Sequence, residues 1–265
     1  MFTILPIKGY IDQIDGFFCD GIHAGLKPNG NNDLGFIYTK EACTVAAIFT
    51  ENRFQAAPLK HFLAYEEGFK TNFVLINSKN ANALTGRKGI EDINTLFSKL
   101  NFDLINPVMS STGVIGNRLP IEKLVTGALK FDLTAKSGEN LSRAIMTTDA
   151  YPKTCLYEVK LEDGSSFKIG AVAKGAGMIN PNLATMLCFI CTDADVPYKD
   201  IKEALNKNKE TTFNAISVDG DTSTNDTVMV LANGKSNAYN KDAFCEALRL
   251  VMHDMAMLMV ADGEG

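Results

Sequence analysis

The sequence has few of the residues and motifs on which the best-known enzyme mechanisms depend. It contains only three histidines, His23, His61 and His253, which are far apart in the chain. It has no G-x-x-x-x-G-K-[ST] phosphate loop, no G-x-G-x-x-G after an expected strand, no H-E-x-x-H and no G-x-S-x-G. A zinc mechanism or a Ser-His-Asp triad is therefore not expected, and no metal site is predicted.

Long charged or apolar segments are also missing. The 26 basic and 31 acidic residues give a net charge of -5 without a Lys/Arg-rich stripe, which argues against a nucleic-acid partner. No stretch approaches the roughly 18 apolar residues that a membrane helix needs. The N-terminal segment "MFTILPIKGY" lacks the basic region with which a signal peptide begins, and its apolar run is too short for one. We therefore expect a soluble, cytoplasmic protein that binds neither nucleic acid nor membrane.

The cysteines do not form a recognisable framework. Six are scattered through the chain, mostly in apolar runs: Cys19, Cys43, Cys155, Cys188, Cys191 and Cys245. This usage is typical of reduced, buried thiols in a cytosolic protein. Cys188 and Cys191 form a C-x-x-C, but they stand inside an expected strand with no second pair and no nearby histidine, so a metal or redox role is not favoured.

Strand-like and helix-like segments alternate along the chain, which predicts an α/β or α+β fold without repeats. An Asp-Gly pair at 163–164 is the strongest turn signal and predicts a hairpin over residues 154–173. Other strands are expected at 71–78, 185–192 and from 227, and another at 105–116 that runs into a glycine turn; helices are expected at 89–100, 119–131, 198–210 and 241–261. The last helix is followed by "ADGEG", so we expect the chain to be the N-terminal part of a longer protein.

Without histidine chemistry, the stretch "KGAGMINPNLATML" at residues 174–187 draws attention to Thr185. A threonine is a weak nucleophile unless a base lies beside it, and an N-terminal threonine can use its own α-amine as that base. The pKa of an α-amine is about 7.7–8.0, so much of it is neutral near pH 7–8. Cleavage after Ala184, where a glycine- and proline-rich loop meets an expected strand, would create such a residue. The plain alternative is a surface loop before a strand that happens to begin with threonine.

Two further stretches have the composition of a site. "SSTGVIG" at 110–116 places hydroxyls beside a glycine amide at a strand end, where they could stabilise an oxyanion, although a simple strand-ending turn has the same sequence. "MTTDAYPK" at 146–153 could hold a zwitterionic ligand or could cap a turn.

Eight blocks of the sequence, taken in order, resemble one family from end to end of the chain. They are "HAGLKPNGNNDLGFI", "AAIFTENRFQAAPLK", "INSKNANALTG", "SSTGVIG", "MTTDAYPK", "KGAGMINPNLATML", "DGDTSTNDTV" and "VADGEG". The family is the bifunctional ornithine acetyltransferase / N-acetylglutamate synthase (glutamate N-acetyltransferase) family of arginine biosynthesis. The resemblance implies a layered αββα-type fold that is similar to, but topologically distinct from, the N-terminal nucleophile hydrolases.

The resemblance also implies a self-cleaving enzyme. The precursor would be cut before Thr185, giving an α chain of residues 1–184 and a β chain that begins at 185, of which 185–265 is the N-terminal part. Thr185 would take the acetyl group from N2-acetyl-L-ornithine as an acetyl-threonine intermediate and pass it to L-glutamate. No cofactor is implied, although some members also use acetyl-CoA as donor. Two α and two β chains would form a heterotetramer.

Site residues follow from the matching blocks. Thr112 and Gly113 match the oxyanion-hole pair. Lys174 matches a substrate-binding lysine, and its charge suits an amino-acid carboxylate. Glu264 matches a substrate-binding acid suited to the ammonium of ornithine. The second threonine of "MTTD", Thr148, is favoured over the first as a further substrate ligand.

Three departures from the family pattern stand out. Lys79 replaces a glycine in "NSKNAN", which we expect to be a loop change away from the chemistry. Asn180 replaces a histidine often found before the Pro-Asn pair, so that histidine cannot be required here. Family members continue for over a hundred residues past the "GEG" block, and that part carries further substrate ligands.

Two alternatives remain open at this stage. A related N-terminal-threonine or serine amidohydrolase or aminopeptidase would use water instead of glutamate as the acceptor. An uncleaved fragment of such an enzyme would catalyse nothing.

Overall fold

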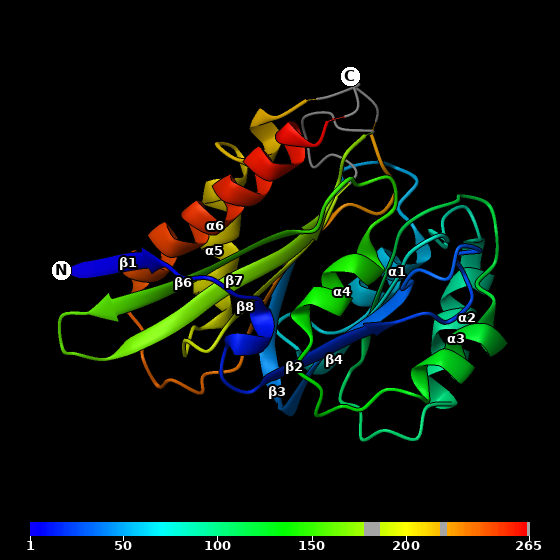
Figure 1. The fold of residues 1–265 in the computed structure, drawn as a ribbon, viewed down its shortest axis with the longest axis horizontal. Coiled ribbons are helices and arrows are strands. Elements are labelled where there is room, and N and C mark those ends of the chain that lie inside the picture. Colours follow the sequence, from blue (N-terminus) through cyan, green and yellow to red (C-terminus); the bar gives the residue numbers. More distant parts are fainter. Residues whose placement is uncertain (178–185, 218–221, 264–265) are drawn as a thin grey trace.

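The computed structural model describes residues 1–177, 186–217 and 222–263, and in this part nine strands form one mixed sheet with helices on both sides (Figure 1). The strands are β1 (Phe2–Pro6), β2 (Phe17–Ile22), β3 (Leu34–Phe49), β4 (Lys70–Asn77), β5 (Val108–Ser111), β6 (Lys153–Leu161), β7 (Ser166–Lys174), β8 (Leu187–Thr192) and β9 (Thr227–Ala232). The helices are α1 (Ala57–Leu63), α2 (Gly86–Ser98), α3 (Ile121–Ala128), α4 (Gly138–Ile145), α5 (Tyr198–Lys209) and α6 (Lys241–Ala261), with short 3-10 turns at Ile11–Gln13 and Phe213–Ala215.

The sheet runs in the order β1-β6-β7-β8-β9-β3-β4-β5, and β2 pairs with β3 outside this path. The long strand β3 changes partners along its length. Its first part pairs with β2 and β4. After an irregularity between Tyr38 and Cys43 it pairs with β4 only at Cys43 and Thr44, and with β9 through Thr44–Phe49. This change of partners joins two parts of the sheet, one made of β6 to β9 and the other of β2 to β5.

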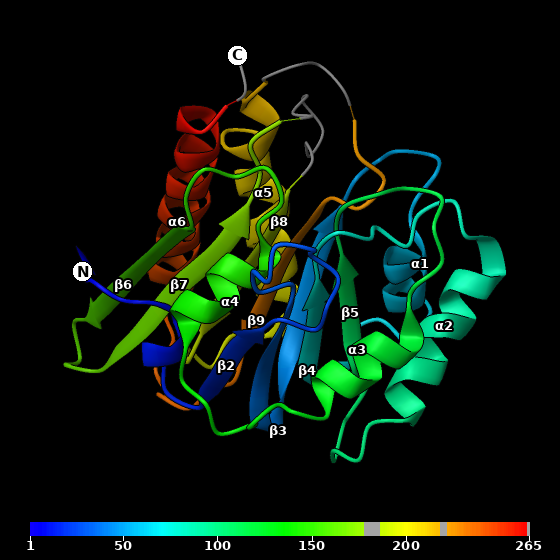
Figure 2. The same ribbon diagram turned by 45° about the vertical axis from the view of Figure 1, so that its right-hand side comes forward.

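Three apolar clusters define the layers. One packs α5 and α6 against β6 to β9, and another packs α2 and α3 against β3 to β5. Between them, side chains of β7, β8 and β9 meet side chains of β2, β3 and β4, joined by Leu141 and Ile145 of α4. Figure 2 shows α5 and α6 on one side of the molecule and α2 and α3 on the other. This confirms the layered αββα arrangement that the resemblance implies.

Most of the expected elements are present where local signals predict them. The hairpin is formed by β6 and β7 around the turn at Gly164, whose φ of +83° suits glycine. Helix α6 begins and ends where its pattern predicts, with the Asn240 side chain accepting a hydrogen bond from the Ala243 N–H. Local signals did not predict β1, β2, β3, α1 or α4, because their patterns are short or mix buried and exposed positions.

The C-x-x-C lies in β8, and its two thiols belong to different layers. Cys188 packs in the cluster under α5 and α6, whereas Cys191 packs in the central cluster between the two parts of the sheet. Residues three apart in a strand point to opposite faces. The two sulfur atoms therefore cannot bind one metal ion or form a disulfide with each other while β8 is intact.

The segments before and after position 185 share one sheet. β7 and β8 pair through six residues each, and β9 lies between β8 and β3.

In the described residues, no helix is both long and apolar enough to cross a lipid bilayer.

Candidate active site

A cavity of about 950 Å³ brings together residues from five separate parts of the sequence. Its wall includes Thr112 and Gly113, Lys174, and both threonines of "MTTD", Thr147 and Thr148. Figure 2 shows the ends of β5 and β7 and the C-terminal end of α6 on the same upper side of the molecule. The fold therefore places at one cavity the described residues that the family blocks implied.

The turn after β5 is held by the backbone. The Thr112 N–H donates to the Asn77 carbonyl at 3.0 Å, and the Val114 N–H donates to the Lys79 carbonyl at 3.1 Å. Gly113 has a φ of +130°, and a Cβ there would lie 2.3 Å from the Lys79 carbonyl carbon and 2.6 Å from the Asn80 nitrogen. Only glycine fits between these backbone atoms. Its N–H has no acceptor among the described residues, which leaves it available to an incoming oxygen.

Lys174 lies at the end of β7, buried beside that turn. Its Nζ atom is 3.5 Å from the Thr112 Oγ1 atom, 62 positions away in sequence. In the ladder Lys174 lies opposite Leu187, which follows Thr185 by two positions. A buried ammonium at this point can bind a carboxylate or stabilise a developing negative charge.

The loop that carries Thr147 and Thr148 is fixed by Asp149. Its carboxylate accepts hydrogen bonds from the Thr147 N–H at 2.9 Å and from the Gly175 N–H at 2.7 Å. Burial would raise the pKa of Asp149, but Lys174 and Lys153 hold that pKa below its ordinary value. Both threonines are exposed at the cavity, so the preference for Thr148 stays a prediction.

A buried ion cluster ties this loop to the end of α6. The fully buried Lys153 ammonium lies 2.8 Å from Asp149 Oδ1 and 2.5 Å from Asp262 Oδ2. Asp262, which follows α6 directly, also accepts a hydrogen bond from the Ala150 N–H at 3.1 Å. The stretches "MTTDAYPK" and "VADGEG" contain these three residues, but nothing in the sequence indicated that the three pair with one another. A lysine between two buried carboxylates anchors the wall of the cavity.

Asn225, which sequence reasoning also missed, supports the glycine turn from behind. Its side-chain amide donates to the carbonyls of Ala81 at 2.6 Å and Ser111 at 2.9 Å, while its Oδ1 accepts from the Thr224 hydroxyl at 2.6 Å. The run of polar residues just before the buried strand β9 is the only local signal of this role. Buried amides need such partners, so the "TSTND" block is built into the site.

Asp226 holds the chain immediately after Thr185. Its buried carboxylate accepts a hydrogen bond from the Met186 N–H at 3.0 Å, and the Thr227 N–H donates to the Met186 carbonyl at 3.1 Å. The second oxygen of Asp226 has no hydrogen-bond partner in the described structure. Burial raises the pKa of Asp226 to about 8.

Several predicted residues cannot be placed. Ala184 and Thr185, the predicted cleavage point and nucleophile, lie outside the described residues, as do Asn180 and Glu264. Their neighbours in the sequence are described. Met186, which follows Thr185, is held by Asp226, and the end of α6, which precedes Glu264, is held by Asp262 and Lys153.

The described wall of the cavity carries more positive than negative charge. Four cations line it, Lys27, Lys79, Arg143 and Lys174, beside the single carboxylate of Asp149.

The expectation that Lys79 lies away from the chemistry is wrong, because Lys79 borders the cavity and its backbone contacts Gly113. In residues 1–177, 186–217 and 222–263, no three His, Cys, Asp or Glu side chains gather as metal ligands.

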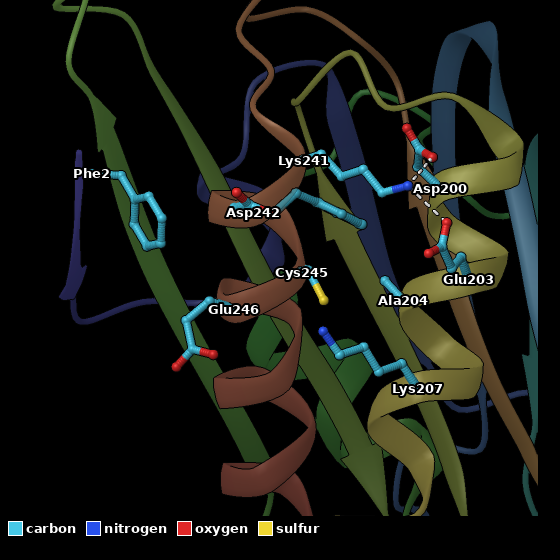
Figure 3. Close-up of a pocket in the computed structure, with 10 residues that line it drawn as sticks. Phe2, Asp200, Glu203, Ala204, Lys207, Lys241, Asp242, Cys245 and Glu246 are labelled. Atoms are coloured by element: carbon cyan, nitrogen blue, oxygen red, sulfur yellow. Dashed lines mark hydrogen bonds and ion pairs between the residues drawn. The ribbon is translucent and has the colours of Figure 1, made fainter.

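A second cavity, of about 530 Å³, lies between α5 and α6 (Figure 3). Three of its charged groups pair with one another: Lys241 lies 3.1 Å from Asp200 and 2.7 Å from Glu203. None of the predicted site residues that the structure describes borders it. The cavity at Thr112 is therefore the better candidate for the active site.

Comparison with known proteins gives a consistent answer. The family model described as the ArgJ family matches residues 18–265. The arginine biosynthesis bifunctional protein ArgJ of Wolinella succinogenes is 54% identical over 268 residues, covering 100% of this chain and 68% of the relative. The ArgJ protein of Oceanobacillus iheyensis is 39% identical, covering 97% of this chain and 66% of the relative. The chain thus spans about two thirds of the length of these curated relatives.

A solved structure shares the fold over most of the chain. The crystal structure of the ArgJ protein of Bacillus halodurans has 32% identity and a TM-score of 0.63, and the match covers 70% of this chain and 99% of that one. An ornithine acetyltransferase of Mycobacterium tuberculosis, solved with ornithine, has 27% identity and a TM-score of 0.56, with 70% and 100% covered.

Proposed function

The chain belongs to the ArgJ family of acetyltransferases in arginine biosynthesis, and we propose that it moves the acetyl group of N2-acetyl-L-ornithine to L-glutamate through an acetyl-threonine at Thr185. The observation that carries this proposal is the meeting of Thr112, Gly113 and Lys174 at one cavity. The strand that begins directly after Thr185 lies beside them, because Leu187 is opposite Lys174.

The first step is cleavage of the Ala184–Thr185 peptide bond. Two features support it. The sheet would hold the two products together, since β7 and β8 pair on either side of the cut. In addition, the two solved relatives are matched almost completely by 70% of this chain, which is about the share made up by residues 1–184.

Acetyl transfer then proceeds in two halves. The α-amine of Thr185 removes the hydroxyl proton as the oxygen attacks the acetyl carbonyl, and the same proton passes to the departing amine of ornithine. The acetyl-enzyme is next attacked by the amine of glutamate, and Thr185 recovers its proton. Both tetrahedral intermediates carry an oxyanion.

The structure suggests which donors meet that oxyanion. The Thr112 N–H already donates to the Asn77 carbonyl, so Thr112 would contribute its hydroxyl and Gly113 its N–H. Loss of one such donor in comparable sites costs about 3–4 kcal/mol of transition-state stabilisation. Lys174 would bind the substrate carboxylate, Thr148 would bind the substrate backbone, and Glu264 would bind the ammonium of ornithine.

We propose that the enzyme needs no cofactor, that acetyl-CoA can serve as an additional donor, and that two α and two β chains assemble in the cytoplasm. These points rest on the family resemblance.

The deciding experiment is the intact mass of the purified protein beside a Thr185→Ala variant. The parent should give two chains on a denaturing gel that stay together under native conditions, and acetylornithine should add one acetyl group to the chain that begins at Thr185. Thr185→Ala should stay uncleaved and inactive, whereas Thr95→Ala, on the exposed face of α2, should behave like the parent. Acetate release without glutamate would favour the amidohydrolase alternative, and a single uncleaved, inactive parent chain would favour the inert fragment.

A further inference from the structure

Lys79 adopts a backbone conformation that normally favours glycine. Its φ is +76°, in the left-handed region that a side chain with a Cβ occupies only at a conformational cost. The residue follows β4 by two positions, in the loop that supports the glycine turn. Retaining a long side chain in this conformation points to a use for that side chain.

The backbone of Lys79 forms part of the oxyanion turn itself. Its carbonyl accepts the hydrogen bond of the Val114 N–H at 3.1 Å, and its carbonyl carbon blocks any side chain at Gly113. The exposed side chain of Lys79 therefore starts beside Gly113 on the wall of the cavity. In the described part of the chain this side chain forms no ion pair or hydrogen bond.

Lys27 lies close enough to Lys79 for their charges to interact. Burial lowers the pKa of Lys27, and the charges of Lys79 and Lys174 lower it further, against the opposing effects of Asp33 and Asp149. The Lys27 ammonium donates to the Asn32 carbonyl at 2.7 Å and pairs with no carboxylate among the described residues. This side of the cavity thus has a surplus of positive charge that an anionic ligand would neutralise.

Arg143 completes the positive side of the cavity but is already engaged. Its guanidinium lies 2.9 Å from Glu139 on the same helix, and both side chains are exposed. Among the cations on the described cavity wall, Lys79 is therefore the exposed one that forms no ion pair with a carboxylate of the protein.

We propose that Lys79 binds the side-chain carboxylate of the acetyl acceptor and so determines the preference of the second half-reaction for a dicarboxylic amino acid. This inference rests on the proposed function. The two amino acids that use the cavity differ mainly at the end of the side chain, which is an ammonium in ornithine and a carboxylate in glutamate. A cation at Lys79 attracts the side-chain carboxylate of glutamate and repels the side-chain ammonium of ornithine. The α-carboxylate is common to both amino acids and gives no discrimination.

The test compares Lys79→Gln, Lys79→Arg and Lys79→Gly with the parent in two separate half-reactions. Lys79→Gln should raise the KM for glutamate about three- to fivefold, the effect of one exposed ion pair, with kcat unchanged. Lys79→Arg should restore the KM. Ornithine release from acetylornithine, measured before any acceptor is added, should change less than the KM for glutamate in Lys79→Gln and in Lys79→Gly.

Glutamine is the matched probe, because it has the shape of glutamate without the charge. The parent should prefer glutamate, and this preference should shrink in Lys79→Gln and in Lys79→Gly. Lys79→Gly should at the same time raise the thermal unfolding midpoint, because it relieves the left-handed backbone. Lys130→Gln, an exposed lysine away from the cavity, should change neither quantity.

An unchanged glutamate preference in Lys79→Gln would overturn the inference while leaving the acetyltransferase proposal intact. A change confined to the KM for acetyl-CoA would also overturn the inference, because Lys79 would then bind the acetyl donor and not the acceptor. Absence of acetyl transfer from the parent to any acceptor would overturn the proposed function and this inference together.

Discussion

The buried carboxylate of Asp226 accepts a hydrogen bond from the backbone N–H of Met186 at 3.0 Å. The amide it holds belongs to the peptide bond that joins Met186 to Thr185. A group that fixes this amide also fixes the start of β8, whose first residue, Leu187, lies opposite Lys174 in the sheet.

This contact predicts an unusual pH dependence of stability. The pKa of Asp226 is about 8 in the folded protein and about 3.9 in an unfolded chain. Between these values the unfolded chain has lost the proton that the folded protein still holds, so the free energy of unfolding should fall as the pH rises. Asp226→Asn should lack this part of the slope in urea titrations at about pH 5 and about pH 8.

Asp163→Asn provides the control for that measurement. Asp163 lies in the exposed β6–β7 turn, and hydrogen bonds from Ser165 lower its pKa, so its proton is lost in both states well below this window. Its slope between the two pH values should match that of the parent. Equal slopes for the parent and Asp226→Asn would contradict the assignment.

Replacing Lys153 should unfold the wall of the cavity. Lys153→Met leaves the buried carboxylates of Asp149 and Asp262 without their cation, a loss that typically costs about 3–5 kcal/mol. Denaturant titration should show this decrease in the free energy of unfolding, and adding Asp149→Asn and Asp262→Asn should recover most of it. The exposed pair of Arg87 and Glu91 is the comparison: Arg87→Met should cost less than about 1 kcal/mol. A cost that small for Lys153→Met would show that the cluster does not anchor the loop.

Two glycines of the same turn should respond differently to alanine. At Gly113 the new Cβ meets the backbone of Lys79 and Asn80, so the turn must move and the oxyanion donor with it. We expect acetyl transfer by Gly113→Ala to fall about 100-fold or more in single-turnover assays. At Gly116 φ is +90°, but no described atom lies within 4 Å of the position that a Cβ would take, so the same change should cost about 1–2 kcal/mol of stability and little activity. Comparable activity losses in the two variants would remove the special role of Gly113.

The four buried cysteines should be chemically inert in the folded protein. Burial raises the pKa of Cys43 to about 12 and places the pKa of Cys19, Cys188 and Cys191 well above the ordinary thiol value. A thiol reagent such as DTNB should therefore leave these four unmodified at neutral pH and should react with all six cysteines after denaturation; the half-buried cysteines are Cys155 and Cys245. Rapid native modification of Cys188 or Cys191 would show that β8 opens.

The local signals of the sequence predicted part of the local structure but not β1, β2, β3, α1 or α4. The Asp163–Gly164 turn predicted the β6–β7 hairpin, and the apolar pattern of 241–261 predicted α6 with its bounds. The order of the eight family blocks predicted the layered fold and the family. The roles of Thr185 and Glu264 stay predictions, because both residues lie outside the described part of the chain.

The sequence by itself determined the kinds of chemical group, the elements that carry them and the family, because turn residues, periodicity and block order act over short distances along the chain. Only the tertiary structure decided which groups meet: Lys174 with Thr112, Lys153 with Asp262, and Asp226 with the amide of Met186. These partners are separated by 40 to 109 positions. Their meeting depends on strand order and on which faces are buried, and the packing of the whole sheet sets both.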